Sequence, residues 1–284
     1  MQLIADSGST KTNWCLVTTD NKQHKLESEG YNPYFLDTAQ ILTSLKTNLT
    51  PQLNSIGIDA EDITEVNFYG AGCSTPSKNK VVVEALKQFF TKAKISVNHD
   101  LLGAARALLQ HNKGFAAILG TGTNTGIYDG KNNVFNIDSL GHFFGDEGSG
   151  FYTSKKLLRD RMRGYLSKDL DKKFSEFSPL GKEEIFDKAY NQPLPNRFVA
   201  SFFRFIVENK EHDYCKKLVG DSFEDFFKNL VIHYENYKDF ELNCVGSVGF
   251  LFSDILKQVS LSYDMKPGVI IQEPIDRLVL YHLS

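Results

Sequence analysis

Two short turns in the sequence have residue types that can bind phosphate: "DSGSTKT" at 6–12 and "GTGTNTG" at 120–126. A glycine in such a turn lets the backbone approach a ligand closely, and successive N–H groups form a concave site for an anion. Asp6, at the end of the preceding predicted strand, can hold Mg²⁺ through a water molecule. Hydroxyl groups and one ammonium group add donors, so the first turn is expected to bind phosphate through Gly8, Ser9, Thr10, Lys11 and Thr12.

The second turn repeats this design with Gly120, Thr121 and Gly122. Two such turns, facing each other across a cleft, would hold the β- and γ-phosphates of a nucleotide from both sides. Neither turn has the P-loop spacing or the G-x-G-x-x-G pattern. A third turn, "VGSVG", precedes a predicted helix, and its Gly246 and Ser247 suit an anion or the adenosine end of a nucleotide. Gly/Ser/Thr clusters also form ordinary turns, and that alternative stays open.

Asp100 lies where the predicted strand "KISVNH" ends and the predicted helix "LLGAARALL" begins. Aspartate is a good N-cap, because its side chain accepts hydrogen bonds from the first free N–H groups of a helix. A carboxylate at the C-terminal end of a strand also lines the ligand-binding edge of an open α/β sheet. Phosphoryl transfer needs a group that takes the proton of the attacking hydroxyl, and an aspartate does this in known kinases. The two roles are compatible.

The predicted elements form two related halves. The first half reads as β-β-β-α-β-α-β-α, and the pattern starts again at "FAAILGTG", with a third strand at "NVFNIDSLG". Helical insertions, expected near 151–164, 182–190, 196–209 and 213–236, make the second half longer. We therefore expect an α/β protein of two domains with a cleft between them. The domains are predicted at 1–112 and 113–273, and a C-terminal helix at about 274–284 is expected to pack back on the first.

The bulk composition excludes several classes of partner. The chain has 284 residues, a net charge of −3 and a pI of about 6.2, so no nucleic-acid partner is expected. Its apolar runs are shorter than the roughly 20 residues of a membrane span, and its N-terminus lacks the features of a signal peptide. The four cysteines have no C-x-x-C spacing. We therefore expect reduced thiols in a cytoplasmic protein that has no membrane partner.

Several segments, in chain order, resemble one known family. The resemblance is to the BadF/BadG/BcrA/BcrD-type ATPase family, specifically its N-acetylglucosamine kinase-like branch. It covers nearly the whole chain and is weakest across 155–240. The family belongs to the actin-like, sugar kinase and heat-shock ATPase superfamily, so the resemblance implies a duplicated ribonuclease-H-like (actin-like ATPase) fold. The segments are "DSGSTKT", "GYNPYF", "GAGCS", "HDLLGAARAL", "ILGTGTNTGIYDG", "LGHFFGDEGSGFY" and "VGSVGFLFSDIL".

The same resemblance implies roles for single residues. Asp100 matches the catalytic base, while Thr10, Lys11 and Thr121 match ATP-phosphate positions and the third turn matches the adenosine region. In N-acetylhexosamine kinases the segment that corresponds to "GDEGSG" contacts the sugar, whose hydroxyls donate strong hydrogen bonds to a carboxylate. The expected sugar contacts are Asn32, Asp100, Thr123, Asn124, Gly145, Asp146 and Glu147.

Some of these positions have a structural alternative. Glu147 either binds the sugar or supports its loop, and the whole "GDEGSG" segment could be a solvent loop with incidental acids. His99 and His142 flank the expected sites, but a lone histidine is more often a hydrogen-bonded structural residue.

The resemblance thus implies a kinase that uses ATP and Mg²⁺ to phosphorylate an amino sugar, such as N-acetylglucosamine, N-acetylmuramic acid or glucosamine. Relatives in the kinase branch often form homodimers, although nothing in this sequence shows an interface. One alternative is an ATP-hydrolysing switch that acts on a protein partner, and another is a non-catalytic sugar sensor. The family also contains activators that hold an iron–sulfur cluster, but here no cysteine closely follows the "GTGTN" turn.

Overall fold

The computed structural model describes residues 1–8 and 10–284. Its internal contacts divide them into two compact units. Unit 1 contains Met1–Lys113, Tyr128–Asn133 and Glu273–Ser284, and unit 2 contains Gly114–Ile127 and Val134–Gln272. The hairpin tip 128–133 belongs to unit 1 because it lies on the end of a helix there, where Arg106 donates a hydrogen bond to the Lys131 carbonyl.

Unit 1 is built on a five-stranded mixed sheet with the order β3-β2-β1-β4-β5. Strand β2 pairs antiparallel with β1 and β3, whereas β4 pairs parallel with β1 and β5. The register sets Ser7 opposite Gly70, and Gly70 opposite His99, so the C-terminal ends of β1, β4 and β5 lie level at one edge of the sheet. The strands are β1 (Gln2–Ser7), β2 (Lys11–Val17), β3 (Gln23–Glu29), β4 (Glu65–Gly70) and β5 (Lys94–His99).

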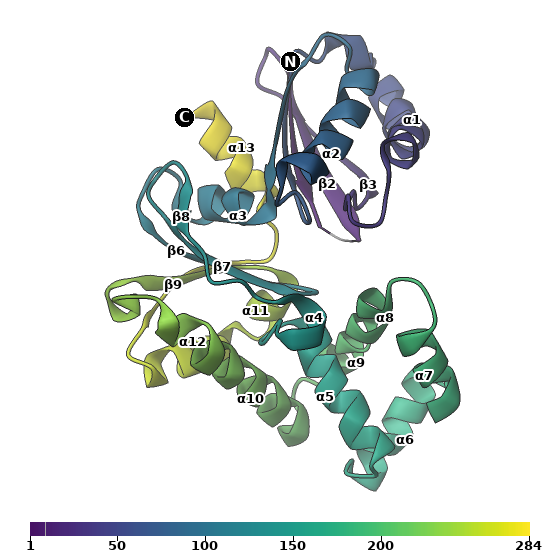
Figure 1. Ribbon diagram of the computed structural model, residues 1–284, viewed down its shortest axis with the longest axis vertical. Helices are drawn as coiled ribbons and strands as arrows, with labels where there is room; N and C mark the ends of the chain where they lie inside the picture. Colours follow the sequence, from purple (N-terminus) through teal and green to yellow (C-terminus); the bar gives the residue numbers. More distant parts are fainter. Residues whose placement is uncertain (9) are drawn as a thin grey trace. The chain divides into compact units, whose positions relative to one another are not determined.

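Helices cover both faces of this sheet (Figure 1). Alternate residues of the strands, among them Leu3, Trp14 and Phe68, form a buried core with α1 and α2. The indole of Trp14 lies 5.8 Å from the Phe68 ring. Helices α3 and α13 pack on the strands and on each other. The helices are α1 (Thr38–Ser55), a 3₁₀ turn (Ala60–Asp62), α2 (Pro76–Phe89), α3 (Asp100–Leu109) and α13 (Ile275–Leu283).

The C-terminal helix α13 is held to α3 by polar contacts as well as by packing. Arg277 donates from Nε to the Ala107 carbonyl at 2.6 Å. Tyr69 shares a hydrogen bond with His282 Nε2 at 2.9 Å and accepts one from Arg106 Nη1 at 2.6 Å. Burial, and then the Arg106 charge, lower the pKa of His282 to about 4. Its imidazole is therefore neutral in the folded protein at neutral pH.

Unit 2 repeats the strand order of unit 1. Its five-stranded sheet has the order β10-β9-β6-β7-β8, in which β9 pairs parallel with β6 and β10. Ile118 lies opposite Val245, and Val245 opposite Ile271, so three strand ends are again level. The strands are β6 (Gly114–Leu119), β7 (Thr123–Tyr128), β8 (Asn133–Phe135), β9 (Glu241–Val245) and β10 (Lys266–Ile271).

Strand β8 is shorter than the sequence predicted, because the chain leaves the sheet after Phe135. The side-chain amide of Asn136 donates to the Thr125 carbonyl. The next backbone N–H, of Ile137, donates to the hydroxyl of Tyr234 at 2.8 Å.

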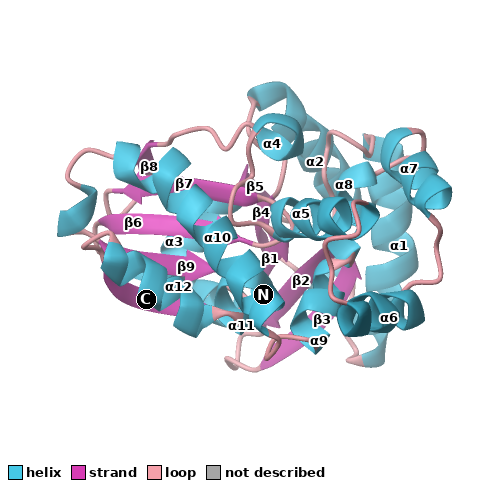
Figure 2. Cartoon of the chain, turned by 90° about the horizontal axis from the view of Figure 1, so that it is seen from below, coloured by secondary structure: helices cyan, strands magenta, loops and turns pink. Residues whose placement is uncertain are grey.

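Most of the helices expected in unit 2 are present. Helices α10 and α12 cover the sheet (Figure 2), and their apolar residues share one buried core with β6 and β9. Two short elements, α4 and α6, were not predicted, and the helix expected at 196–209 divides at Phe202. The helices are α4 (Gly141–Phe144), α5 (Gly150–Met162), α6 (Lys168–Phe177), α7 (Lys182–Tyr190), α8 (Pro195–Ser201), α9 (Phe203–Glu208), α10 (Asp213–Asn229), α11 (Ser247–Leu251) and α12 (Ser253–Ser262), with 3₁₀ turns at Val231–His233 and Tyr237–Asp239.

Among the described residues, no helix combines the length and the apolar character needed to cross a bilayer. All four cysteines are free and buried, and burial raises the pKa of the Cys73 thiol to about 12. None of them therefore offers a reactive thiolate.

The contact of His282 with Tyr69 predicts a specific acid sensitivity. The folded pKa of His282 lies below its ordinary value of 6.5, so the unfolded chain binds more protons between about pH 6.5 and 4. Stability contributed by the neutral imidazole is complete above that range and is lost as the pH falls through it. Wild-type protein loses free energy of unfolding between pH 7 and pH 4.5. His282→Gln should make this loss smaller by up to about 2 kcal/mol. Urea unfolding at both pH values measures this, with the exposed His233→Gln as the matched control. An unchanged pH dependence in the His282 variant would contradict the assignment.

Candidate functional site

The first glycine-rich turn connects β1 and β2 at the level edge of sheet 1. Gly8 N donates to the Lys11 carbonyl at 2.9 Å, and Ser9 lies outside the described residues. Ser7 and Thr12 are buried and their hydroxyls bond each other at 2.7 Å, while Thr12 also donates to the Glu29 carbonyl. These two hydroxyls therefore shape the turn rather than face a ligand. Gly8 is exposed, and among the described residues a Cβ there would meet the Lys11 carbonyl, at 3.6 Å.

Asp6 carries the most perturbed carboxylate of this edge. Burial, and then the negative charges of Asp100 and Glu273, raise its pKa to about 7, and Lys11 only partly offsets them. Three carboxylates thus lie close enough to interact beside one ammonium group. Oxygen ligands of this kind suit Mg²⁺. Within residues 1–8 and 10–284, however, no three acidic, His or Cys side chains are grouped closely enough to hold a metal ion by themselves. Asp6 therefore fits a Mg²⁺ ion that takes its other ligands from water and phosphate.

Lys11 is bound to acidic side chains. Its Nζ lies 2.8 Å from Glu27 Oε1 and 3.8 Å from Glu273 Oε1. The hydrogen bond to Glu27 makes the largest contribution to the raised pKa of Lys11. Because the side chain is 44% exposed, these pairs are weak and a phosphate can replace them. The sequence did not point to Glu273, which follows β10 far along the chain.

Asp100 begins helix α3, and His99 is its N-cap. The His99 Nδ1 atom accepts a hydrogen bond from Leu102 N at 3.2 Å, so the capping role proposed for Asp100 belongs to its neighbour. Asp100 Oδ1 accepts from Leu101 N at 2.8 Å. The charge of Asp100 also raises the pKa of both Asp6 and Cys73. The predicted base therefore lies at the same edge as the first phosphate turn, as the parallel register requires.

Asn32, a predicted sugar contact, lies at this edge as well. It is 7% exposed, and its Oδ1 accepts from Tyr34 N at 3.0 Å. Gly72 follows β4 with φ +78°, and a side chain there would collide with the Asn32 amide. The "GAGCS" segment therefore leaves room for Asn32 beside the end of β4.

In unit 2 the second turn is fixed to the start of helix α5. Gly150 N donates to the Gly120 carbonyl at 2.8 Å, and Phe151 N donates to the Thr121 carbonyl at 3.1 Å. These bonds satisfy two helix N–H groups and hold the turn rigid. A Cβ on Gly120 would meet no atom of the described residues within 4 Å, so the turn has room for a side chain at this position.

Asp146 of the "GDEGSG" segment has a structural role that the sequence did not reveal. Asp146 is 8% exposed and has φ +58°, and its Oδ1 accepts from Thr123 N at 3.1 Å. Thr123 Oγ1 donates to the Glu147 carbonyl at 2.6 Å. The acidic loop and the second turn are therefore braced together. Burial raises the pKa of both Asp146 and Glu147, and the Lys155 charge opposes this.

The other predicted sugar contacts in unit 2 are also engaged locally. Asn124 Oδ1 accepts from Thr125 N and from Asn136 Nδ2, each at 3.0 Å. A side chain on Gly145 would collide with the Ser139 carbonyl, so that glycine is required by packing. His142 lies with its ring 5.2 Å from Phe151, outside this network.

The third turn meets the second at a pocket of about 350 Å³ in unit 2. Gly120 and Thr121 line one part of it and Ser247 another, which agrees with the level ends of β6 and β9. Gly246 has φ +128°, and a side chain there would collide with the Leu119 carbonyl. The remaining wall comes largely from α8 and α9, including Phe203 and Arg204, which carried no sequence signal because they stand in no motif.

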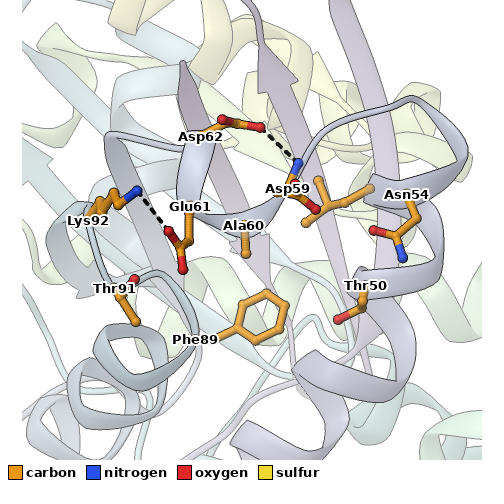
Figure 3. Close-up of a pocket in the computed structure, with 10 residues that line it drawn as sticks. Thr50, Asn54, Asp59, Ala60, Glu61, Asp62, Phe89, Thr91 and Lys92 are labelled. Carbon is orange, nitrogen blue, oxygen red and sulfur yellow. Dashed lines mark hydrogen bonds and ion pairs between the residues drawn. The ribbon is translucent and has the colours of Figure 1, made fainter.

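A larger pocket in unit 1, of about 590 Å³, is not part of this arrangement. It lies between the end of α1, the 3₁₀ turn and the end of α2 (Figure 3). Glu61 and Lys92 form an exposed ion pair across it at 2.7 Å. None of the predicted site residues lines it. The predicted residues thus form two groups, one at the level edge of each sheet.

The chain is similar to known proteins over most of its length. The model of the BadF/BadG/BcrA/BcrD ATPase family matches residues 5–213. An N-acetylmuramic acid/N-acetylglucosamine kinase of Clostridium acetobutylicum is 19% identical over 274 residues, covering 91% of this chain and 90% of the relative. A crystal structure from Porphyromonas gingivalis, of a protein provisionally named an N-acetylglucosamine kinase, has a TM-score of 0.92 and 37% identity over 99% of this chain and 98% of its own.

A second structure, from Chromobacterium violaceum and provisionally given the same name, has a TM-score of 0.75 at 15% identity, covering 99% of this chain and 98% of its own. That similarity concerns the fold. Together with the repeated strand order, it confirms the duplicated ribonuclease-H-like fold predicted from the sequence.

Two glycines test which turn residues face a ligand. Gly120→Ala should leave thermal stability close to that of the wild type, because the new methyl group meets nothing. It should weaken ATP binding about tenfold, because the added methyl group keeps a phosphate away from the turn at a cost comparable to one hydrogen bond to a charged group. Gly246→Ala should instead lower stability by about 2 kcal/mol or more, because its φ is unfavourable and its Cβ collides with backbone. Thermal unfolding and ATP calorimetry on both variants measure this. Unchanged ATP affinity in a folded Gly120→Ala would refute the assignment.

The brace between Asp146 and Thr123 predicts a difference between two substitutions. Asp146→Asn keeps an oxygen that can accept from Thr123 N, and asparagine tolerates a positive φ. It should be as stable as the wild type. Asp146→Ala leaves the Thr123 N–H unpaired and should lose about 1–3 kcal/mol. Urea unfolding compares the three proteins, and equal losses in both variants would show that no such brace exists.

Proposed function

Because the chain belongs to the BadF/BadG/BcrA/BcrD ATPase family, we propose that it is a kinase that transfers the γ-phosphoryl group of ATP to a hydroxyl of an amino sugar. The acceptor class is N-acetylglucosamine or a related hexosamine such as N-acetylmuramic acid or glucosamine, in line with the names of the relatives. The observation that carries the proposal is the common edge of sheet 1, where a phosphate-type turn, Asp6 and Asp100 lie together.

Each unit by itself offers groups that suit a nucleotide. In unit 2 the 350 Å³ pocket offers apolar side chains for a base, while Ser247 and the second turn offer polar groups for ribose and phosphate. In unit 1 the exposed Gly8 lets phosphate approach the backbone, and the ammonium of Lys11 binds phosphate oxygens. The rigid attachment of Gly120 and Thr121 to α5 means that little reorganisation accompanies binding.

In unit 1, Asn32 is the proposed contact of the acceptor sugar and Asp100 the general base; in unit 2, the acidic pair is proposed as a further sugar contact. Asp100 takes the proton of the attacking hydroxyl, whose oxygen then attacks the γ-phosphorus in line as the bond to the leaving ADP breaks. Mg²⁺, when bound with the nucleotide near Asp6, supplies the positive charge that neutralises the phosphates. Asp6 is half-ionised near pH 7, and a cation beside it favours the ionised form.

Asp100→Asn tests the base. The amide can still accept from Leu101 N, so the start of α3 is kept, but it cannot take a proton. Turnover should fall by about 10²–10⁴ while ATP affinity and thermal stability stay at wild-type values. A coupled ADP-release assay gives kcat, and calorimetry gives the affinity. A fall of less than about tenfold would exclude Asp100 as the base.

The same assay over a panel of sugars tests the reaction itself. ADP release should depend on an amino sugar and should produce a sugar phosphate in equal amount. Glucose, which lacks the amino group, serves as the matched control acceptor. ADP release that is independent of every sugar would favour an ATP-hydrolysing switch.

A further inference from the structure

Unit 2 contains a second cavity that the proposed reaction does not use. Its volume is about 520 Å³, and it lies between α5, α7 and α8, with His142 and Phe143 of α4 at one side. Figure 1 shows these helices grouped beside the sheet. None of the residues assigned to phosphate, base or sugar lines it.

Helix α5 turns one continuous stripe toward this cavity. The stripe contains Phe151, Lys155, Leu158, Arg159 and Arg163, which recur at three- and four-residue steps and therefore share one face. Apolar and cationic side chains alternate along it. This wall of the cavity therefore presents both apolar surface and positive charge.

The facing helices complete a mainly apolar lining. Helix α7 contributes Lys182, Ile185, Phe186 and Tyr190, again at helical spacing. Lys182 Nζ lies 5.6 Å from the centre of the Phe186 ring. Helix α8 contributes Val199. Tyr190 is 79% exposed, so the cavity opens to solvent on this side.

The charges around the cavity are unbalanced. Among the described residues that line it, none is acidic, while four are lysine or arginine. Neighbouring cations of α5 that point elsewhere have acidic partners: Lys156 pairs with Asp225 and Arg161 with Asp171. Of the cations in the lining, Arg159 pairs with Asp160. No carboxylate among the described residues lies within ion-pair distance of the other three, Lys155, Arg163 and Lys182.

We propose that this cavity binds a small organic anion with an apolar body. The aromatic and aliphatic walls would bury the body, and Lys155, Arg163 and Lys182 would bind the anionic group at the rim. Such a ligand adds the negative charge that the lining lacks, and it covers apolar surface that now faces water.

The ligand chemistry has two sources. It is either an anionic substituent of the acceptor itself or a separate effector molecule. Lys155 connects the cavity to the acidic loop, because its charge acts on both Asp146 and Glu147. An anion bound to Lys155 therefore alters the electrostatic environment of the acidic pair, and with it the binding of an acceptor. The proposed anion site is argued from the geometry of the cavity alone. Only the first source, an anionic substituent of the acceptor, rests on the proposed function.

Anilinonaphthalene sulfonate, an aromatic anion, is a direct probe, and uncharged phenylnaphthylamine is its matched control. The sulfonate should bind saturably, with a fluorescence increase and greater affinity than the uncharged probe. The variant Arg163→Glu with Lys182→Glu should raise the Kd of the sulfonate about tenfold and leave that of phenylnaphthylamine unchanged. Both side chains are exposed, so the fold should tolerate the changes. Lys172→Glu, on the exposed surface of α6 and outside the lining, makes the same type of change elsewhere.

An unchanged sulfonate Kd in the double variant, or an equal loss in Lys172→Glu, would overturn the proposal. This measurement needs no turnover, so it stands even if the kinase proposal fails. A kinetic arm separates the two sources. If the anion is part of the acceptor, the double variant raises KM for a carboxylate-bearing amino sugar and spares the uncharged one. If it is an effector, the sulfonate shifts KM for the uncharged sugar in the wild type and not in the double variant.

Discussion

Parallel pairing of strands is the constraint on which both halves of the candidate site depend. In unit 1 the register that sets Ser7 opposite Gly70 and Gly70 opposite His99 brings three segments, far apart in sequence, to one edge. The same order in unit 2 levels the ends of β6, β9 and β10. At such an edge the chain leaves the sheet, and a glycine with exposed backbone, such as Gly8, can come close to a ligand. The carboxylates and the glycine turns can act together only because the pairing brings these ends together.

The two edges differ in their electrostatics. At the edge in unit 1, burial and the neighbouring carboxylates raise the pKa of Asp6 to about 7, and the ammonium of Lys11 is shared between Glu27 and Glu273. The turn at the edge of unit 2 has no charged side chain of its own, and its carbonyls are bound by the first N–H groups of α5. One edge is therefore suited to a cation bound with phosphate, and the other to polar contacts with a nucleotide.

The parts of the site that the sequence predicted are those that depend on neighbouring residues. The glycine turns, the order of strands and helices along the chain and the position of Asp100 at a strand end follow from local patterns. The sequence did not predict that Glu273 would lie beside Lys11, that Asp146 would bind Thr123 N, or that α8 and α9 would line a pocket. Each of these depends on a contact between distant segments. The glycines Gly120, Gly145 and Gly246 also could not be told apart from the sequence, because all three stand in similar motifs. Among the described residues, a side chain on Gly120 would meet no atom within 4 Å, whereas Gly145 and Gly246 are required by packing.

Helix α5 connects features that look independent in the sequence. Its first N–H groups hold the second turn, and its N-cap Ser149 is part of the acidic loop, since Ser149 N donates to the Asp146 carbonyl. One turn further along, Lys155 lies in the cavity lining and acts on the charge of the acidic pair. A small displacement of this helix would therefore move the turn and the loop together. Packed helices shift as rigid bodies. A ligand bound along the exposed face of α5 would therefore also displace its N-terminus, where the second turn and the acidic loop are attached.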